Sequence, residues 1–373
     1  MRNRTQTHNI ARRLRALILV MVLLMLGLQI GYFYTLREQT MREAEGSAAN
    51  LSRSLSQHAE DTFEMAGLAL SSLVDAMDAQ DTTSVGARQI LHQVMVNEVA
   101  AAPRLRGLFI YDEAGNWIAS SLAEMPTQLN NADRAYFKHH RDSVSSAIFI
   151  GPPVRSRSTG EWIITVTRRY DKIDGTFGGV VLASLPASYF ANFYKRFDIG
   201  SNGIIALFNL DGTIYARVPF SENIVGTNLS ASPLFVDQIP KASAGTYRYA
   251  SSIDGVERVS GYQVGSRYPL VVIAARAKDQ VLASWWSDVL VLGTTAAILV
   301  LLLAYLGMRL ANQVMRRQEV EADLARLAST DALTGPAALD VAEEELRVRL
   351  RQRARRTCTL LHSNTITLVR THA

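Results

Sequence analysis

Residues 204–218, IIALFNLDGTIYARV, and residues 108–120, LFIYDEAGNWIAS, have the same pattern of apolar and turn residues. This recurrence decides the fold class. Each stretch is an apolar run, a turn that contains Asp and Gly, and a second short run, which is the pattern of a β-hairpin. Hairpins of this kind are common, so two of them need not be related. We favour a true repeat because the elements around the two hairpins come in a similar order.

Besides the hairpin at residues 204–218, seven strands and two helices are predicted, and the first two of these strands form the hairpin at residues 108–120. The predicted strands are Leu105–Tyr111, Trp117–Ser120, Trp162–Arg169, Gly179–Leu185, Tyr247–Ser251, Arg258–Val264 and Leu270–Ala275. Helices are predicted at Val85–Ala101 and, starting at a proline, at Pro186–Phe197. The sequence therefore predicts an α+β fold of two similar modules in tandem, a distal one at about residues 80–185 and a proximal one at about residues 200–276, which the resemblance described below identifies as PAS-like.

Two long apolar runs without charge lie outside the modules, at residues 16–36 and 289–308. At 1.5 Å per residue each can cross the roughly 30 Å hydrocarbon core of a membrane, and each is longer than is usual for a buried core helix. A cleaved signal peptide is the alternative for the first run, but residues 16–36 form a longer apolar stretch than a signal peptide has. We predict transmembrane helices at 16–36 and 286–308, with a long helix at Arg37–Ala79 after the first.

The charge is distributed unevenly along the chain. Residues 1–36 hold five Arg and no acid, residues 37–288 hold 23 Lys and Arg against 26 Asp and Glu, and residues 289–373 hold 11 Arg against 8 acids. The net charge of +5 therefore lies beside the spans. This distribution predicts cytoplasmic termini, at 1–15 and beyond 308, and a periplasmic domain at 37–284 in the inner membrane of a bacterium.

The mildly acidic external domain removes the support for nucleic-acid binding that a basic chain would give. The single cysteine, Cys358, excludes a disulfide framework.

The long helix, the two modules and the return helix resemble a double Cache (dCache) sensor domain, over about residues 37–284. The stretch Asp133-Arg134-Ala135-Tyr136-Phe137 is similar to the Arg-x-aromatic-aromatic element on the pocket helix of that family. Ile150–Pro153 and Trp162–Arg168 resemble the loop and strand that follow it.

This resemblance implies a pocket for a small periplasmic ligand, with Arg134, Tyr136, Phe137, Trp162 and Ser184 as the expected ligand-binding residues. An arginine can present a planar fork to a carboxylate, and aromatic side chains can wall a small pocket. Amino-acid-binding members hold the amine with an Asp where this chain has Ser184. This difference from the amino-acid-binding members favours a small carboxylate as the ligand, with an amino acid as the alternative.

The alternative is a purely structural role, in which Arg134 pairs with Asp133 or Asp142 and Tyr136 is a core residue. We interpret four further cations, Arg155, Arg157, Arg168 and Arg169, as solvated edge positions. Adjacent histidines at 139 and 140 point about 100° apart on a helix, so we expect no metal site there. No motif in the external domain indicates catalysis.

A charged helix is predicted at residues 309–330, and its partial apolar seam favours a homodimer. Asp331-Ala332-Leu333-Thr334-Gly335 follows and resembles the opening motif of GGDEF-type diguanylate cyclase domains, which Asp331, Leu333, Thr334 and Gly335 match. Intact relatives in that family convert two GTP into cyclic di-GMP and need Mg²⁺.

The match to the cyclase family ends at Pro336, and the sequence holds no Gly-Gly-Asp/Glu-Glu-Phe turn. Residues 336–373 are too few for a catalytic domain of about 100–150 residues. We interpret residues 331–373 as a truncated or frame-shifted start of that domain, and we expect no catalytic residue, metal or cofactor.

The resulting hypothesis is a signal-transduction receptor of the cyclase family, embedded in lipid and inactive as a cyclase. The alternatives are a non-catalytic partner of an intact cyclase and a sensor of another output class.

Overall fold

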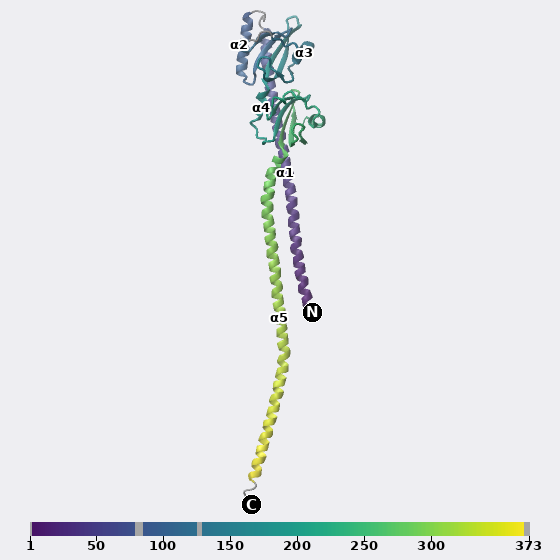
Figure 1. Ribbon diagram of the computed structural model, residues 1–373, viewed down its shortest axis with the longest axis vertical. Coiled ribbons are helices and arrows are strands. Elements are labelled where there is room, and N and C mark those ends of the chain that lie inside the picture. The colour runs from purple at the N-terminus through teal and green to yellow at the C-terminus, as the bar shows by residue number, and fades with distance from the viewer. Residues whose placement is uncertain (1, 79–84, 125–128, 369–373) are drawn as a thin grey trace. The chain divides into compact units, whose positions relative to one another are not determined.

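The computed structural model describes residues 2–78, 85–124 and 129–368 (Figure 1). Its contacts divide the chain into two units. One unit is Tyr32–Leu290, and the other joins Met1–Gly31 with Val291–Ala373. The long helices α1 (Arg2–Asp78) and α5 (Lys278–Leu368) contribute to both units.

The first sheet of the larger unit is antiparallel throughout. Its strands are β1 (Gly107–Asp112), β2 (Trp117–Ser120), β3 (Phe149–Ile150), β4 (Val154–Arg155), β5 (Trp162–Asp171) and β6 (Phe177–Pro186). They lie in the order β2-β1-β6-β5-β3, with β4 also paired to β5.

The second sheet is antiparallel as well, in the order β8-β7-β11-β10-β9. Its strands are β7 (Ile204–Asn209), β8 (Ile214–Val218), β9 (Ala244–Ala250), β10 (Glu257–Val264) and β11 (Leu270–Ala277). In both sheets the hairpin pairs with the last strand, which pairs with the strand before it. The predicted α+β class is confirmed, and both sheets are antiparallel.

The short helices of the larger unit are α2 (Val85–Ala101), α3 (Ala135–Asp142), α4 (Ala187–Tyr194) and the π-helix η1 (Leu234–Gln238). Helix α2 has the predicted bounds. Helix α4 differs at its start, because Pro186 has an extended ψ of 132° and ends β6 instead of opening the helix. The sequence patterns did not predict η1 or the two-residue strands β3 and β4.

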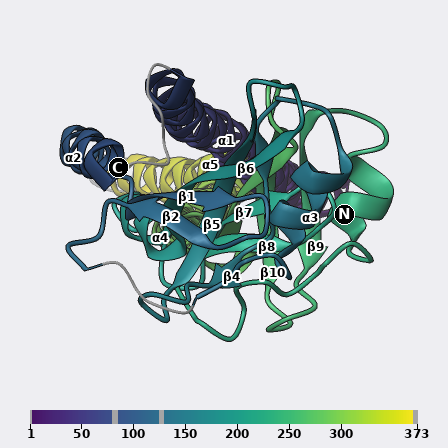
Figure 2. The same ribbon diagram turned by 90° about the horizontal axis from the view of Figure 1, so that it is seen from above.

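Helices α2 and α3 lie on opposite sides of the first sheet (Figures 1 and 2). Alternation along β1 explains this arrangement, since successive side chains of a strand point to opposite faces. Leu108 and Ile110 join the core that includes Leu91 of α2, whereas Phe109 and Tyr111 join a cluster under α3. The first sheet is thus covered on both faces.

Helix α1 packs along both sheets. Leu55, Phe63 and Leu70 recur at the predicted helical spacing and share one core with strand residues of both sheets. Near Ala48 the helix backbone comes so close to β10 that a Cβ at Gly261 would lie 2.3 Å from the backbone carbon of Ala48. Only glycine fits there.

The smaller unit contains the apolar parts of α1 and α5. Each of these helices has a segment that is long and apolar enough to cross a membrane, and the side chains of both segments are exposed rather than buried. This exposure fits a span better than the core helix of a soluble domain. Arg15 Nη2 donates to Asn312 Oδ1 at 3.4 Å within this unit.

Helix α5 does not end at residue 330, as expected for a separate signalling helix, but continues through Asp331–Gly335 to Leu368. The side chains of Asp331, Leu333, Thr334 and Gly335 lie outside the described residues.

Candidate ligand-binding pocket

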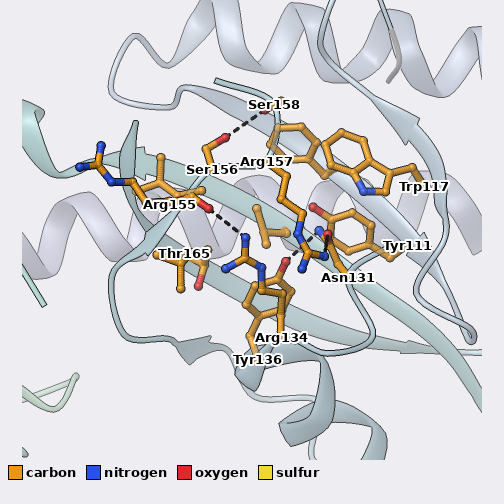
Figure 3. A pocket seen from close by; sticks show the side chains of 14 residues that line it. Tyr111, Trp117, Asn131, Arg134, Tyr136, Arg155, Ser156, Arg157, Ser158 and Thr165 are labelled. Carbon is orange, nitrogen blue, oxygen red and sulfur yellow. Dashed lines mark hydrogen bonds between the residues drawn. The ribbon is translucent and has the colours of Figure 1, made fainter. Parts of the chain in front are cut away.

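A hollow of about 310 Å³ opens on the face of the first sheet that carries α3. Strand residues form its floor, namely Phe109, Tyr111, Trp117, Ile163, Thr165 and Leu182. Residues of α3, of the short strand β4 and of the loops form its rim, namely Asn131, Arg134, Tyr136, Val154, Arg155, Ser156, Arg157 and Ser158. Figure 3 shows these side chains around the hollow.

The floor is aromatic because the β1–β2 hairpin places three rings on this face. The Trp117 ring lies edge-on to Phe109 at a centroid distance of 5.0 Å and edge-on to Tyr111 at 5.6 Å. Trp117 and Tyr111 are cross-strand partners beside a β-bulge. Such a wall suits an apolar or aliphatic part of a ligand.

Two tyrosines at the floor and rim are neutral hydrogen-bonding groups. Tyr136, at the first turn of α3, accepts a bond from Asn131 Nδ2 at 2.9 Å. Burial raises the pKa of Tyr136 to about 12, and burial together with the neighbouring Tyr136 raises the pKa of Tyr111 well above its ordinary value. Their hydroxyl groups can therefore orient a ligand without adding charge.

Arg134 precedes α3 as its N-cap residue and points its guanidinium over the hollow. Its Nη2 donates to the backbone oxygen of Arg155 at 2.9 Å, as the dashed line in Figure 3 shows. Neither alternative ion pair forms, because Asp133 pairs with Arg157 and Asp142 pairs with Arg141.

The two other rim arginines have carboxylate partners. Arg157 Nη2 lies 2.7 Å from Asp133 Oδ2, and this bond lowers the pKa of Asp133. Arg155 Nη2 lies 2.7 Å from Glu222 Oε2. Three guanidinium groups therefore line the hollow, and the ion pairs of the described residues provide carboxylate partners for only two of them. This excess of positive charge favours an anionic ligand.

Two polar atoms of the floor have no hydrogen-bond partner among the described residues, Thr165 Oγ1 and Trp117 Nε1. Buried polar groups are nearly always paired, by protein, water or ligand. The Gly151 backbone lies close to Thr165, since a Cβ at Gly151 would come within 2.7 Å of that hydroxyl oxygen. Thr165 and Trp117 both line the hollow.

The structure brings together two of the five predicted ligand-binding residues, Arg134 and Tyr136. Phe137 packs under α3 beside Phe177, with ring centroids 5.7 Å apart. The Trp162 ring lies under the Arg155 guanidinium, with Arg155 Cζ 4.7 Å from the ring centroid. Ser184 is on the same face of β6 as Leu182, but its hydroxyl donates to the backbone oxygen of Gly107 at 3.2 Å.

The sequence patterns missed most of the floor and part of the rim. Trp117 and Tyr111 were assigned to strands, and only the register of β1 against β2 reveals that they share one face. Arg157 was interpreted as a solvated edge residue, but its Nη1 donates a hydrogen bond to Asn131 Oδ1 at 2.9 Å beside the hollow. That interpretation is wrong for Arg169, which is 8% exposed and donates to the backbone oxygen of His140.

Helix α3 is fixed to the sheet by His140, which is buried. Its Nε2 lies 3.0 Å from Thr167 Oγ1 on β5. Burial, with a smaller effect of His139, lowers the pKa of His140 to about 4. Within the described residues, His, Cys, Asp and Glu side chains form no group of three that could hold a metal ion.

Comparison with known proteins gives three findings. The dCache_1_like family, described as a histidine kinase sensor domain, matches residues 187–275. The extracellular domain of rpHK1S-Z16, described as a histidine kinase, is 34% identical with a TM-score of 0.59, and the match covers 65% of this chain and 98% of that domain. The ligand-binding domain of the Pseudomonas fluorescens chemoreceptor CtaA, solved with L-isoleucine, is 17% identical with a TM-score of 0.52, covering 67% of this chain and 99% of that domain.

A methyl-accepting chemotaxis protein of Bacillus thuringiensis is 24% identical over 115 residues. The match covers 31% of this chain and 17% of that protein, so it concerns a small part of the relative.

Proposed function

The chain belongs to the dCache family of sensor domains found in histidine kinases and chemoreceptors, and on this premise we propose that it is a membrane receptor for a small extracellular ligand. Two helices able to span a membrane flank the sensor domain, as this role requires. The receptor needs no cofactor to bind its ligand.

The ligand is a small carboxylate or an amino acid, bound in the hollow of the first sheet. The observation that carries this proposal is the Arg134 guanidinium, which lies over an aromatic floor and bonds to a neutral backbone oxygen. A carboxylate fits that fork bidentately. The L-isoleucine of the CtaA structure is an amino acid with an aliphatic side chain, which the floor suits.

The sensor consists of two Cache modules in tandem, distal at about 80–185 and proximal at about 200–276. The shared strand order of the two sheets supports this division. The arginines before the first span and after the second support cytoplasmic termini in a bacterial inner membrane, with the sensor in the periplasm. The receptor works as a homodimer.

The output class has two candidates. The motif Asp331–Gly335 supports a link to diguanylate cyclases. In that case the chain pairs with an intact cyclase and passes the ligand signal to it. The histidine kinase and chemotaxis relatives support an output of their own classes instead. Co-purification of the full chain from its host separates the two, because the first predicts a cyclase in the complex and the second a kinase or a chemotaxis coupling protein.

The ligand proposal is tested by calorimetric titration of the full chain in detergent with L-isoleucine, L-valine, lactate, acetate and succinate. We expect at least one to bind, and Arg134→Ala to weaken that binding about tenfold or more, because a charge-assisted bond is lost. Arg141→Ala is the matched control, since Arg141 is exposed and pairs with Asp142. Equal affinity of the wild type and Arg134→Ala would remove Arg134 from the site.

A further inference from the structure

A second hollow, with an empty volume of about 520 Å³, lies on the second sheet. Its wall includes the apolar cluster of Phe208, Ile214, Leu234 and Ile273, which lies on the face of the sheet away from the α1 core. The hollow is larger than that of the first sheet, and the proposed function does not use it.

One charged side chain reaches this hollow, Arg217 of β8. Arg217 is 8% exposed, and its Nε has no hydrogen-bond partner among the described residues. Its only ion pair there is a long one, with Nη2 at 3.5 Å from Asp254 Oδ2. A buried guanidinium with so few partners is costly unless something else pairs with it.

Asp254 cannot neutralise Arg217 alone, because a second arginine binds it more closely. Arg258 donates to both oxygens of Asp254, at 2.7 and 2.8 Å, and is itself 3% exposed. Two buried guanidinium groups therefore share one carboxylate beside the hollow. Burial lowers the pKa of Arg217, whereas the neighbouring Asp254 raises it.

We propose that this hollow is a second ligand site, which takes a small monocarboxylate whose carboxylate group pairs with Arg217. Serine hydroxyls at the rim, those of Ser232, Ser251 and Ser252, can add hydrogen bonds. Among the lining residues of this hollow that the structure describes, none is acidic, so no lining carboxylate would pair with the ammonium group of an amino acid. The site therefore selects a carboxylate with a short apolar tail over an amino acid, and the rest of the lining receives that tail.

The test is calorimetric titration of the full chain in detergent with butyrate, and with butyramide as the uncharged probe of matched shape. We expect butyrate to bind and butyramide not to bind. Arg217→Gln weakens butyrate about tenfold or more, because the charge-assisted bond is lost. Ser232→Phe fills the hollow from its rim, leaves Arg217 in place and also abolishes binding, so it decides the case if Arg217→Gln fails to fold.

The titrations are carried out in an Arg134→Gln background, which removes the carboxylate anchor proposed for the first hollow, so that butyrate bound there does not contribute. Arg141→Ala, at an exposed residue that lines neither hollow, is the control and leaves butyrate binding within about twofold. The proposal is overturned if, in that background, butyrate does not bind, if butyramide binds equally well, if a folded Arg217→Gln binds butyrate as tightly as the background chain, or if binding persists in Ser232→Phe. None of these outcomes decides whether the first hollow binds a ligand, because that claim depends on Arg134 and its own panel of ligands.

Discussion

Protonation of His140, on the helix beside the first hollow, is linked to the stability of the fold. Its folded pKa of about 4 lies below the ordinary value of 6.5, so the unfolded chain binds the proton more tightly. This residue therefore stabilises the fold above pH 6.5, and its contribution is lost as the pH falls toward 4. Burial and Arg104 lower the pKa of His58 to about 4 as well, so it acts in the same window.

We expect thermal melts of the full chain, followed by near-ultraviolet circular dichroism, to show stability falling between pH 6.5 and 4.5. His140→Gln keeps a partner for Thr167 but removes one titrating group, so it reduces the steepness of that fall by about half. Lys138→Gln is the control, because Lys138 is exposed on the same helix. A slope unchanged by His140→Gln would show that His140 is not the linked group.

At the scale of single residues, the resemblance motif identified Arg134 and Tyr136 because both lie on one short helix start. The resemblance also implied Phe137, Trp162 and Ser184 at the site, and the structure places none of the three among the lining residues. Sequence position alone cannot tell how far along a strand the hollow reaches. Arg157 lies in the loop between β4 and β5, for which no sequence periodicity exists.

At the scale of elements, Glu60 fixes α1 to the turn between β10 and β11. Its carboxylate is 3% exposed and accepts the backbone N–H of Arg267 at 2.6 Å and the Ser266 hydroxyl at 3.2 Å. Glu60→Ala leaves both donors unpaired, and we expect it to lower the free energy of unfolding by about 2–4 kcal/mol, measured by denaturant titration.

Glu64, one turn further along α1, is the matched control for Glu60. It pairs with the Arg267 side chain, and both side chains are nearly half exposed. An exposed pair of this kind contributes about 0–1 kcal/mol, so Glu64→Ala has a small effect. Equal losses for the two variants would mean that Glu60 does not anchor the helix.

The elements themselves were largely predictable, because α1, α2 and the long strands have the periodicity that burial on one or two faces imposes. The two-residue strands β3 and β4 and the π-helix η1 were not predicted, since they are too short to show a period. Of these elements, β4 and the loop that follows it carry part of the rim of the first hollow, and this is why the site was harder to predict than the fold.

At the scale of the whole molecule, the proposed topology can be tested with the single native cysteine, Cys358. Ile173 lies fully exposed in the β5–β6 hairpin. In a Cys358→Ser background, we expect Ile173→Cys to react with a membrane-impermeant maleimide in spheroplasts. Native Cys358 reacts only after the membrane is permeabilised. Labelling of Cys358 in intact spheroplasts would contradict a cytoplasmic C-terminus.

The central claim is that the hollow of the first sheet receives the ligand of this receptor. Hydrogen–deuterium exchange of the full chain tests it most directly, with and without the panel member that binds most tightly. We predict slower exchange on binding at residues 131–136 and 154–165, which carry Arg134, Tyr136 and Thr165. This protection disappears in Arg134→Ala. Protection confined to segments outside the first sheet, or unchanged protection in Arg134→Ala, would contradict the account.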